Sequence, residues 1–135
     1  MPGKFFDTNI LLYIVSSHPA KAGQARAIVR EGGAISVQVL NEVTNVARRK
    51  MRLTWPEVHA LLDLLRGLVA VHPLTIEVHE IGIALAERYG LQTWDAMIAA
   101  SAIHARCDIL WSEDMQNGQV LGNRLRVVDP FRMTS

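Results

Sequence analysis

The chain has 135 residues, of which 50% are hydrophobic and 20% are charged. This composition is typical of a folded globular protein and excludes a disordered chain. The length fits a single domain over residues 1–135, which is large enough to bury a core without disulfides. With 14 basic and 13 acidic side chains, the net charge of +1 gives no indication of a polyanionic partner.

The cysteine content and the apolar segments further limit the possible classes of protein. Cys107 is the only cysteine, which excludes an internal disulfide and a cysteine-rich zinc site. No segment approaches the roughly 18 consecutive apolar residues of a membrane helix. Asp7 and Asn9 interrupt the first apolar run, so the amino-terminal segment lacks a signal-peptide pattern. We therefore expect a soluble, cytoplasmic protein with no membrane partner.

Apolar runs, helical periodicities and breaker residues predict a regular succession of strands and helices. In chain order, we expect a strand over 4–6, helices over 9–15 and 20–30, a strand over 34–36, helices over 36–50 and 54–67, a strand over 68–74, helices over 75–89 and 95–106, and strands over 108–112 and 125–130. Strands that alternate with helices in this way indicate right-handed βαβ units. The fold class is therefore α/β, with a central parallel sheet of about five strands and helices on both faces.

Polar residues at the predicted helix starts account for several of these boundaries. Thr54 and Glu57 have the spacing of a capping box, in which each side chain binds the backbone of the other. Gly90 is expected to end the helix over 75–89. We expect the remaining helices to be capped or opened by Asn9, Ser36, Thr75 and Asp95.

Acidic side chains fall where such folds bind their ligands, beyond the carboxyl ends of the strands. Asp7 directly follows the first strand, and Asp114 lies just beyond the fourth. Asp95 opens a helix after a short loop, and Glu42 borders the buried stripe of the helix over 36–50. Each of these residues alone is equally consistent with a helix cap, a turn residue or a solvated surface residue.

Together, these acids near one sheet edge would repel one another unless a cation lay among them. No Lys or Arg adjoins any of the four in the sequence. Carboxylate oxygens favour a hard divalent cation, Mg²⁺ or Mn²⁺. Such a cation can activate water and neutralise charge on a phosphate, which predicts phosphoryl chemistry.

Other catalytic motifs lack support in the sequence. It contains neither a dinucleotide-binding glycine motif nor a P-loop, and its five histidines form no zinc-binding pattern. Cys107 has no sequence partner that would make it a nucleophile. An aspartate after the first strand also occurs in phosphoryl-acceptor domains. However, Asp7 has no second aspartate two residues later, and no lysine follows the fourth or fifth strand.

With these residues, the sequence resembles the PIN domain family, in particular the VapC-type toxins of bacterial toxin–antitoxin pairs. The resemblance covers essentially the whole chain and rests on four acidic motifs in order, FFDTNILLY, VLNEV, TWDAMIAASA and LWSEDMQNG. It implies a three-layer α/β/α fold and a Mg²⁺- or Mn²⁺-dependent endoribonuclease. It also implies an RNA substrate, a homodimer and silencing by a cognate antitoxin protein.

The resemblance also implies roles for individual residues. The catalytic acids would be Asp7, Glu42, Asp95 and Asp114. Of these, the three aspartates would bind the metal directly or through water. The polar residues that would orient or support the acids are Asn9, Ser112 and Asn117. Many relatives carry a further acid near the last of these positions, so its neutral side chain leaves open whether one or two metals bind.

Further features of the sequence lead to separate expectations. A basic run is a candidate RNA-binding site formed by Arg48, Arg49, Lys50 and Arg52. Its position at a helix end slightly favours the alternative, in which these cations are only solvated. Trp55 and Trp94 are expected to be core or capping residues, and Glu113 is expected to point into solvent. The apolar helix Val58–Leu65 is a candidate surface for the antitoxin.

The alternative to a ribonuclease is a non-catalytic PIN-like module that binds ligands in an acidic pocket. The complete set of four acids favours catalysis over this alternative. A Mn²⁺ titration without binding would favour the module instead.

Overall fold

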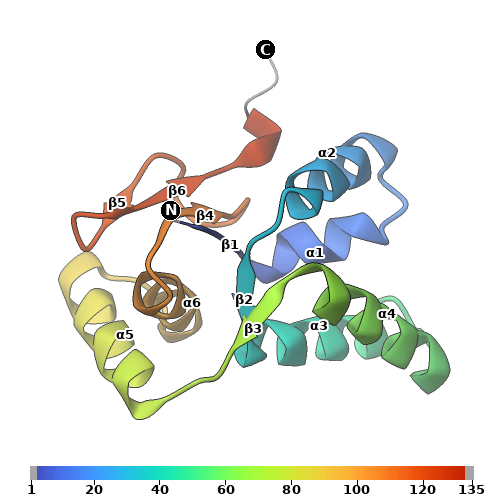
Figure 1. Ribbon diagram of the computed structural model, residues 1–135, viewed down its shortest axis with the longest axis horizontal. Helices are drawn as coiled ribbons and strands as arrows, with labels where there is room; N and C mark the ends of the chain where they lie inside the picture. Colours follow the sequence, from blue (N-terminus) through green and yellow to red (C-terminus); the bar gives the residue numbers. More distant parts are fainter. Residues whose placement is uncertain (1–2, 133–135) are drawn as a thin grey trace.

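The computed structural model describes residues 3–132 as a central sheet with helices on both of its faces (Figure 1). In chain order the elements are β1 (Gly3–Phe6), α1 (Thr8–Ile14), α2 (Pro19–Arg30), β2 (Ala34–Ser36), α3 (Val37–Arg49), α4 (Trp55–Leu68), β3 (Ala70–His72), α5 (Ile76–Tyr89), α6 (Thr93–His104), β4 (Cys107–Trp111), β5 (Val120–Leu121), β6 (Leu125–Val128) and the 3₁₀ turn η1 (Pro130–Arg132). No helix within this part of the chain is long and apolar enough to cross a membrane.

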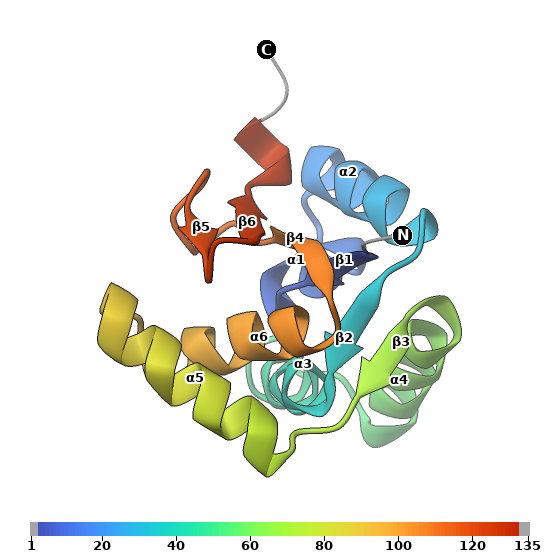
Figure 2. The same cartoon turned by 60° about the vertical axis from the view of Figure 1, so that its left-hand side comes forward.

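The sheet has six strands in the order β3-β2-β1-β4-β6-β5, and all neighbouring pairs are parallel except β5 with β6. Helices α1 and α2 lie on one face, and α5 and α6 lie on the other (Figure 2). This arrangement confirms the predicted α/β fold class with three layers. The prediction missed β5, because two residues are too few to show a periodic pattern.

The strands are apolar because the middle of the sheet is covered on both faces. Phe5 and Phe6 in β1 and Leu110 in β4 are completely buried. Across the sheet, β1 and β4 lie side by side in the register Phe6↔Trp111. The carboxyl ends of these two central strands therefore meet at one edge, which is where the acidic residues follow.

The predicted helix caps are confirmed at several helices. Thr54 and Glu57 form both hydrogen bonds of a capping box, and Ser36 and Thr75 cap α3 and α5. Gly90 ends α5 in the left-handed conformation. Two other predicted starts were wrong. The carboxylate of Asp7 caps α1 instead of Asn9, and α6 begins at Thr93, with Asp95 in its first turn.

The core takes up part of the apolar surface of α4 that was expected to be available to a partner. Val58, Leu61 and Leu65 are buried in the core. The helix leaves Leu64 and Leu68 exposed instead, beside a shallow hollow that includes Arg26 of α2. The helical period explains this outcome, because only one stripe of α4 faces the sheet.

Gly33, directly before β2, packs closely against Phe6 and gives a first prediction. A Cβ atom there would lie 2.5 Å from the Phe6 ring, and φ is +156°. We expect Gly33→Ala to lower the free energy of unfolding by about 2–4 kcal/mol. Gly23→Ala, in the exposed part of α2 with open space around it, should instead raise stability by about 0.5–1 kcal/mol. Urea denaturation measures both values, and equal effects of the two substitutions would contradict the packing described here.

Candidate functional site

The site is built on the continuation of β1 and β4 beyond the sheet. The backbone N–H of Asp7 donates to the carbonyl of Trp111 at 2.9 Å, which extends the ladder by one residue. Ser112, the residue directly after β4, then donates its hydroxyl to Asp7 Oδ2 at 2.7 Å. Both side chains are buried. The sheet therefore fixes the first acid of the site through backbone and side-chain bonds at once.

Burial has a strong effect on the charge of Asp7. Its other oxygen, Oδ1, accepts the backbone N–H of Thr8 at 2.7 Å. Removal from water outweighs the hydrogen bonds from Ser112 and Thr8 and raises the pKa of Asp7 to about 6, with smaller contributions from the charges of Asp95 and Glu42. A charged Asp7 is therefore costly in this site unless a cation approaches it.

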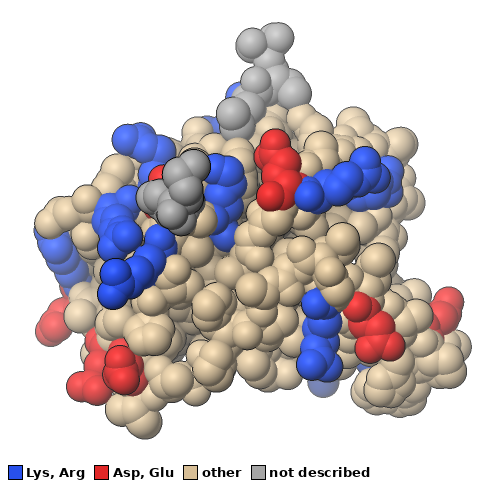
Figure 3. Space-filling view, in the orientation of Figure 1, with Lys and Arg blue, Asp and Glu red and all other residues tan. Residues whose placement is uncertain are grey.

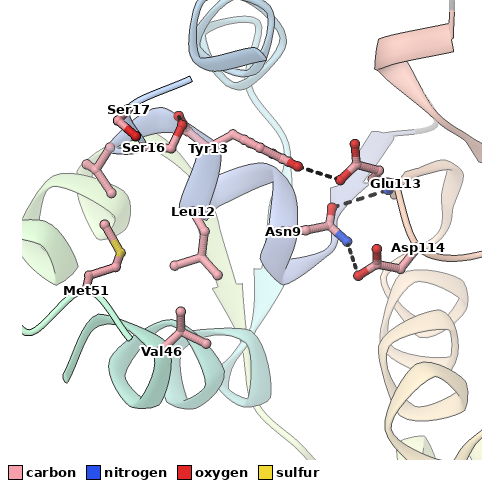
Figure 4. A pocket seen from close by; sticks show the side chains of 10 residues that line it. Asn9, Leu12, Tyr13, Ser16, Ser17, Val46, Met51, Glu113 and Asp114 are labelled. Carbon is pink, nitrogen blue, oxygen red and sulfur yellow. Dashed lines mark hydrogen bonds between the residues drawn. The ribbon is translucent and has the colours of Figure 1, made fainter. Parts of the chain in front are cut away.

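Asn9 connects Asp7 to the last acid of the set. Its Nδ2 group donates to Asp114 Oδ2 at 3.0 Å and makes a longer contact of 3.4 Å to Asp7 Oδ2. Its Oδ1 atom accepts the backbone N–H of Glu113 at 3.3 Å (Figure 4). One amide side chain thus holds the loop after β4 against the start of α1.

Glu113 is half-buried and paired instead of pointing freely into solvent, which corrects the sequence-based expectation. It forms an ion pair with Lys21 and accepts the hydroxyl of Tyr13 at 2.7 Å. Desolvation opposes ionisation of Glu113, but the bonds from Lys21 and Tyr13 prevail and lower its pKa. The Lys21 ammonium also lies 5.1 Å from the centre of the Phe131 ring. These contacts tie α1, α2 and η1 to the loop that carries Asp114.

Glu42 and Asp95 approach the site from α3 and α6. Gln38 joins the two helices, because its Nε2 group donates to Glu42 Oε1 and to the carbonyl of Trp94, both at 3.1 Å. Burial raises the pKa of Asp95, and the charges of Asp114 and Glu42 raise it further. Sequence reasoning missed Gln38, although its position four residues before Glu42 on one helix was a usable signal.

Several surface hollows meet at these acids. Asp114 and Asn9 border a hollow of about 590 Å³ whose apolar end is formed by Leu12, Val46 and Met51 (Figure 4). Asp114 and Asp95 together border a second, more polar hollow between α5 and the loop after β4. The acids are therefore accessible from more than one side.

The donor set has the chemistry that a hard divalent cation requires. Among residues 3–132, none of the four acids forms an ion pair with a Lys, Arg or His side chain. No group of three or more His, Cys, Asp or Glu side chains in the same range is gathered closely enough to hold a metal by itself. These acids fit a cation that keeps several water ligands and uses few direct protein ligands, as Mg²⁺ does.

Asn117 and the basic run, which were also predicted as site residues, make other contacts. The Oδ1 atom of Asn117 accepts the backbone N–H of Asp129 at 2.8 Å, so this oxygen stabilises the loop. In the basic run, Arg48 donates to the carbonyl of Leu53 at 2.9 Å and lies 4.5 Å from the Trp55 ring centre. The other cations of the run, Arg49, Lys50 and Arg52, are exposed.

The structure also shows a basic surface that the sequence did not indicate. Figure 3 shows Lys and Arg side chains gathered over the part of the molecule formed by β5 and β6. Arg124 and Arg126 are exposed there, and the register places Lys4 and Arg126 on either side of Ile109. These residues lie at or near the amino ends of their strands, whereas the acids follow the carboxyl ends. This surface is therefore separate from the acidic site.

Asp7 gives a prediction about stability without metal. Its pKa in the folded protein, about 6, exceeds its ordinary value of 3.8, so its ionisation costs stability as the pH rises from about 4 through 6. In EDTA at pH 7.5, we expect Asp7→Asn to raise the free energy of unfolding by roughly 1–3 kcal/mol. At pH 4.5 most of this gain should vanish.

Urea denaturation at the two pH values measures the effect, with Asp63→Asn on the exposed side of α4 as the control. A gain from Asp7→Asn that is the same at both pH values would contradict the costly charge.

Solved structures with similar folds include several toxin–antitoxin proteins. A toxin–antitoxin complex from Klebsiella pneumoniae is 23% identical over 94% of this chain and 97% of that chain, with a TM-score of 0.73. DNA-bound VapBC from Salmonella typhimurium is 16% identical over 96% and 99%, with a TM-score of 0.68. VapC20 from Mycobacterium tuberculosis, described as a Sarcin-Ricin loop cleaving toxin, is 16% identical over 82% and 89%, with a TM-score of 0.64. At these identities, the similarity shows a shared fold.

The sequence itself shows the family. A search among curated proteins returned no match. The family model described as the PIN domain matches residues 4–117, a range that includes all four acids. The chain therefore belongs to the PIN domain family.

Proposed function

We propose that this protein is a Mg²⁺- or Mn²⁺-dependent endoribonuclease and the toxin of a toxin–antitoxin pair that acts in the cytoplasm. The observation that carries the proposal is the meeting of four acids from separate elements at one sheet edge, where burial and mutual repulsion raise the pKa of Asp7 and Asp95. Membership of the PIN family supports a nuclease. The similar fold of a toxin described as cleaving the Sarcin-Ricin loop supports RNA as the substrate.

The residues of the site divide into three groups by role. Asp7, Asp95 and Asp114 would bind the divalent cation directly or through its water ligands, and Glu42 would orient the attacking water. When bound, the cation would lower the pKa of a bound water and neutralise charge on the phosphate. Asn9 and Ser112 keep the carboxylates in place through the bonds described above. Hydrolysis of the phosphodiester would leave a 5′-phosphate and a 3′-hydroxyl.

The hollow in Figure 4 is suited to an inhibitory antitoxin segment. Leu12, Val46 and Met51 would receive an apolar side chain, and Asp114 at the other end would receive a basic one. A cation from the antitoxin would offset the repulsion among the acids and exclude metal. The similar folds include toxins solved with their antitoxins, which supports a partner of this kind. We also propose that the free protein is a homodimer.

A non-catalytic PIN-like binding module is the second candidate. It is favoured by the finding that no three acids within residues 3–132 are gathered around a common metal position. The module would bind phosphates or cations without cleaving RNA. Cleavage by the purified protein therefore separates the two candidates.

A cleavage assay with purified protein tests the proposed function. We expect cleavage of unstructured RNA with Mg²⁺ or Mn²⁺, and none in EDTA. Asp7→Asn and Asp95→Asn should each lower the rate by at least about 100-fold, because each removes charge from the cation site. The matched control Asp63→Asn should cleave at the wild-type rate. The proposal is wrong if the variants cleave as fast as the wild type, or if cleavage persists unchanged in EDTA.

A further inference from the structure

Trp94 occupies an unusual position for a large aromatic residue. Its side chain is 66% exposed, in the first turn of α6 and directly before Asp95. The expectation that Trp94 is a core or capping residue is therefore wrong, because the structure leaves most of the ring in water. An exposed tryptophan beside a candidate site indicates a contact surface for a ligand or partner.

The backbone that carries this ring is held firmly. The carbonyl of Trp94 accepts the Nε2 group of Gln38 at 3.1 Å, and the same group donates to Glu42. Gln38 itself is buried. The backbone that carries the indole and Asp95 is thus linked to Glu42 through one amide. A residue whose backbone is already fixed loses less conformational freedom when a ligand binds to its side chain.

A hollow of about 520 Å³ lies between this ring and the acids. Its apolar side consists of Trp94 and Leu74, and Glu42 and Asp95 lie on its border. Its remaining lining includes amide side chains, which are Asn41, Asn45 and Gln92. Amides both donate and accept hydrogen bonds, so they can read the edge of a base. The hollow therefore offers an aromatic face, polar groups and access to the acids.

We propose that this hollow binds one unpaired RNA base, which stacks on Trp94 beside the phosphate that is cleaved. Single-stranded RNA is recognised through splayed bases that stack on aromatic rings and bond to polar side chains. The proposal deepens the proposed function and rests on it, because it assumes an RNA substrate at the acids. It assigns to Trp94 and the amides the choice of the nucleotide next to the cleavage site.

A second copy of the chain is the competing occupant of this surface. Ile76 is 74% exposed and lies with Leu74 and Trp94 along an adjoining apolar hollow. However, a protein cover over Trp94 would also bury Glu42, Asp95 and the amides, and burial of unpaired charges is costly. The mixture of amides and acids around the ring therefore favours a base.

The experiment measures binding without cleavage. Asp7→Asn protein in EDTA is titrated into a labelled unstructured oligoribonucleotide. It is also titrated into a series of oligomers of the same sequence, each of which lacks the base at one nucleotide. Adding Trp94→Ala should weaken binding of the intact oligomer by roughly 5- to 150-fold. Trp94→Phe should keep most of the affinity. The control Leu64→Ala, which removes an apolar side chain that is 50% exposed on α4, should change nothing.

With Trp94 present, one abasic oligomer should bind as weakly as the intact oligomer binds to Trp94→Ala. With that abasic oligomer, Trp94→Ala should weaken binding no further. The proposal is overturned if Trp94→Ala binds intact RNA normally, or weakens every abasic oligomer equally. It is also overturned if the protein binds no RNA, or if sedimentation velocity shows that Trp94→Ala only dissociates a dimer while base dependence is unchanged. Base-dependent binding by a protein that never cleaves RNA would refute the proposed function alone.

Discussion

The buried carboxylate of Asp7 is the constraint on which the rest of the site depends. It sits where β1 and β4 end, capping α1 with one oxygen and accepting the Ser112 hydroxyl with the other. Neither bond compensates fully for the loss of water, as the raised pKa shows. The fold thus holds a charge that becomes favourable only when a positive group comes to the sheet edge.

The surrounding contacts make this edge rigid on both sides. On the side of β4, Asn9 and the Glu113–Lys21 pair hold the loop that carries Asp114. On the opposite side, Gln38 fastens α3 to the first turn of α6. The acids are therefore positioned by neutral amides and by one cation already satisfied by Glu113. This arrangement leaves their own charges free for a ligand.

Much of the fold and the placement of the acids could be predicted from the sequence, because both follow from local patterns. An acid that directly follows a strand, as Asp7 does, can be placed at the sheet edge from the sequence, because the carboxyl ends of parallel strands meet there. The pairing of Glu113 with Lys21 and the bond from Gln38 to the carbonyl of Trp94 could not be foreseen, because each joins segments distant in the chain. The exposure of Trp94 was equally hidden, since composition alone places a tryptophan in the core.

The central claim is that a divalent cation offsets the charge of Asp7, and calorimetric titration with Mn²⁺ in buffers of different ionisation enthalpy tests it most directly. With a pKa of about 6, saturable binding at pH 6 should release about half a proton from Asp7, and almost none at pH 7.5. Asp7→Asn should remove this contribution to the proton release and weaken binding. The absence of saturable binding, or the same proton release by Asp7→Asn, would contradict the account.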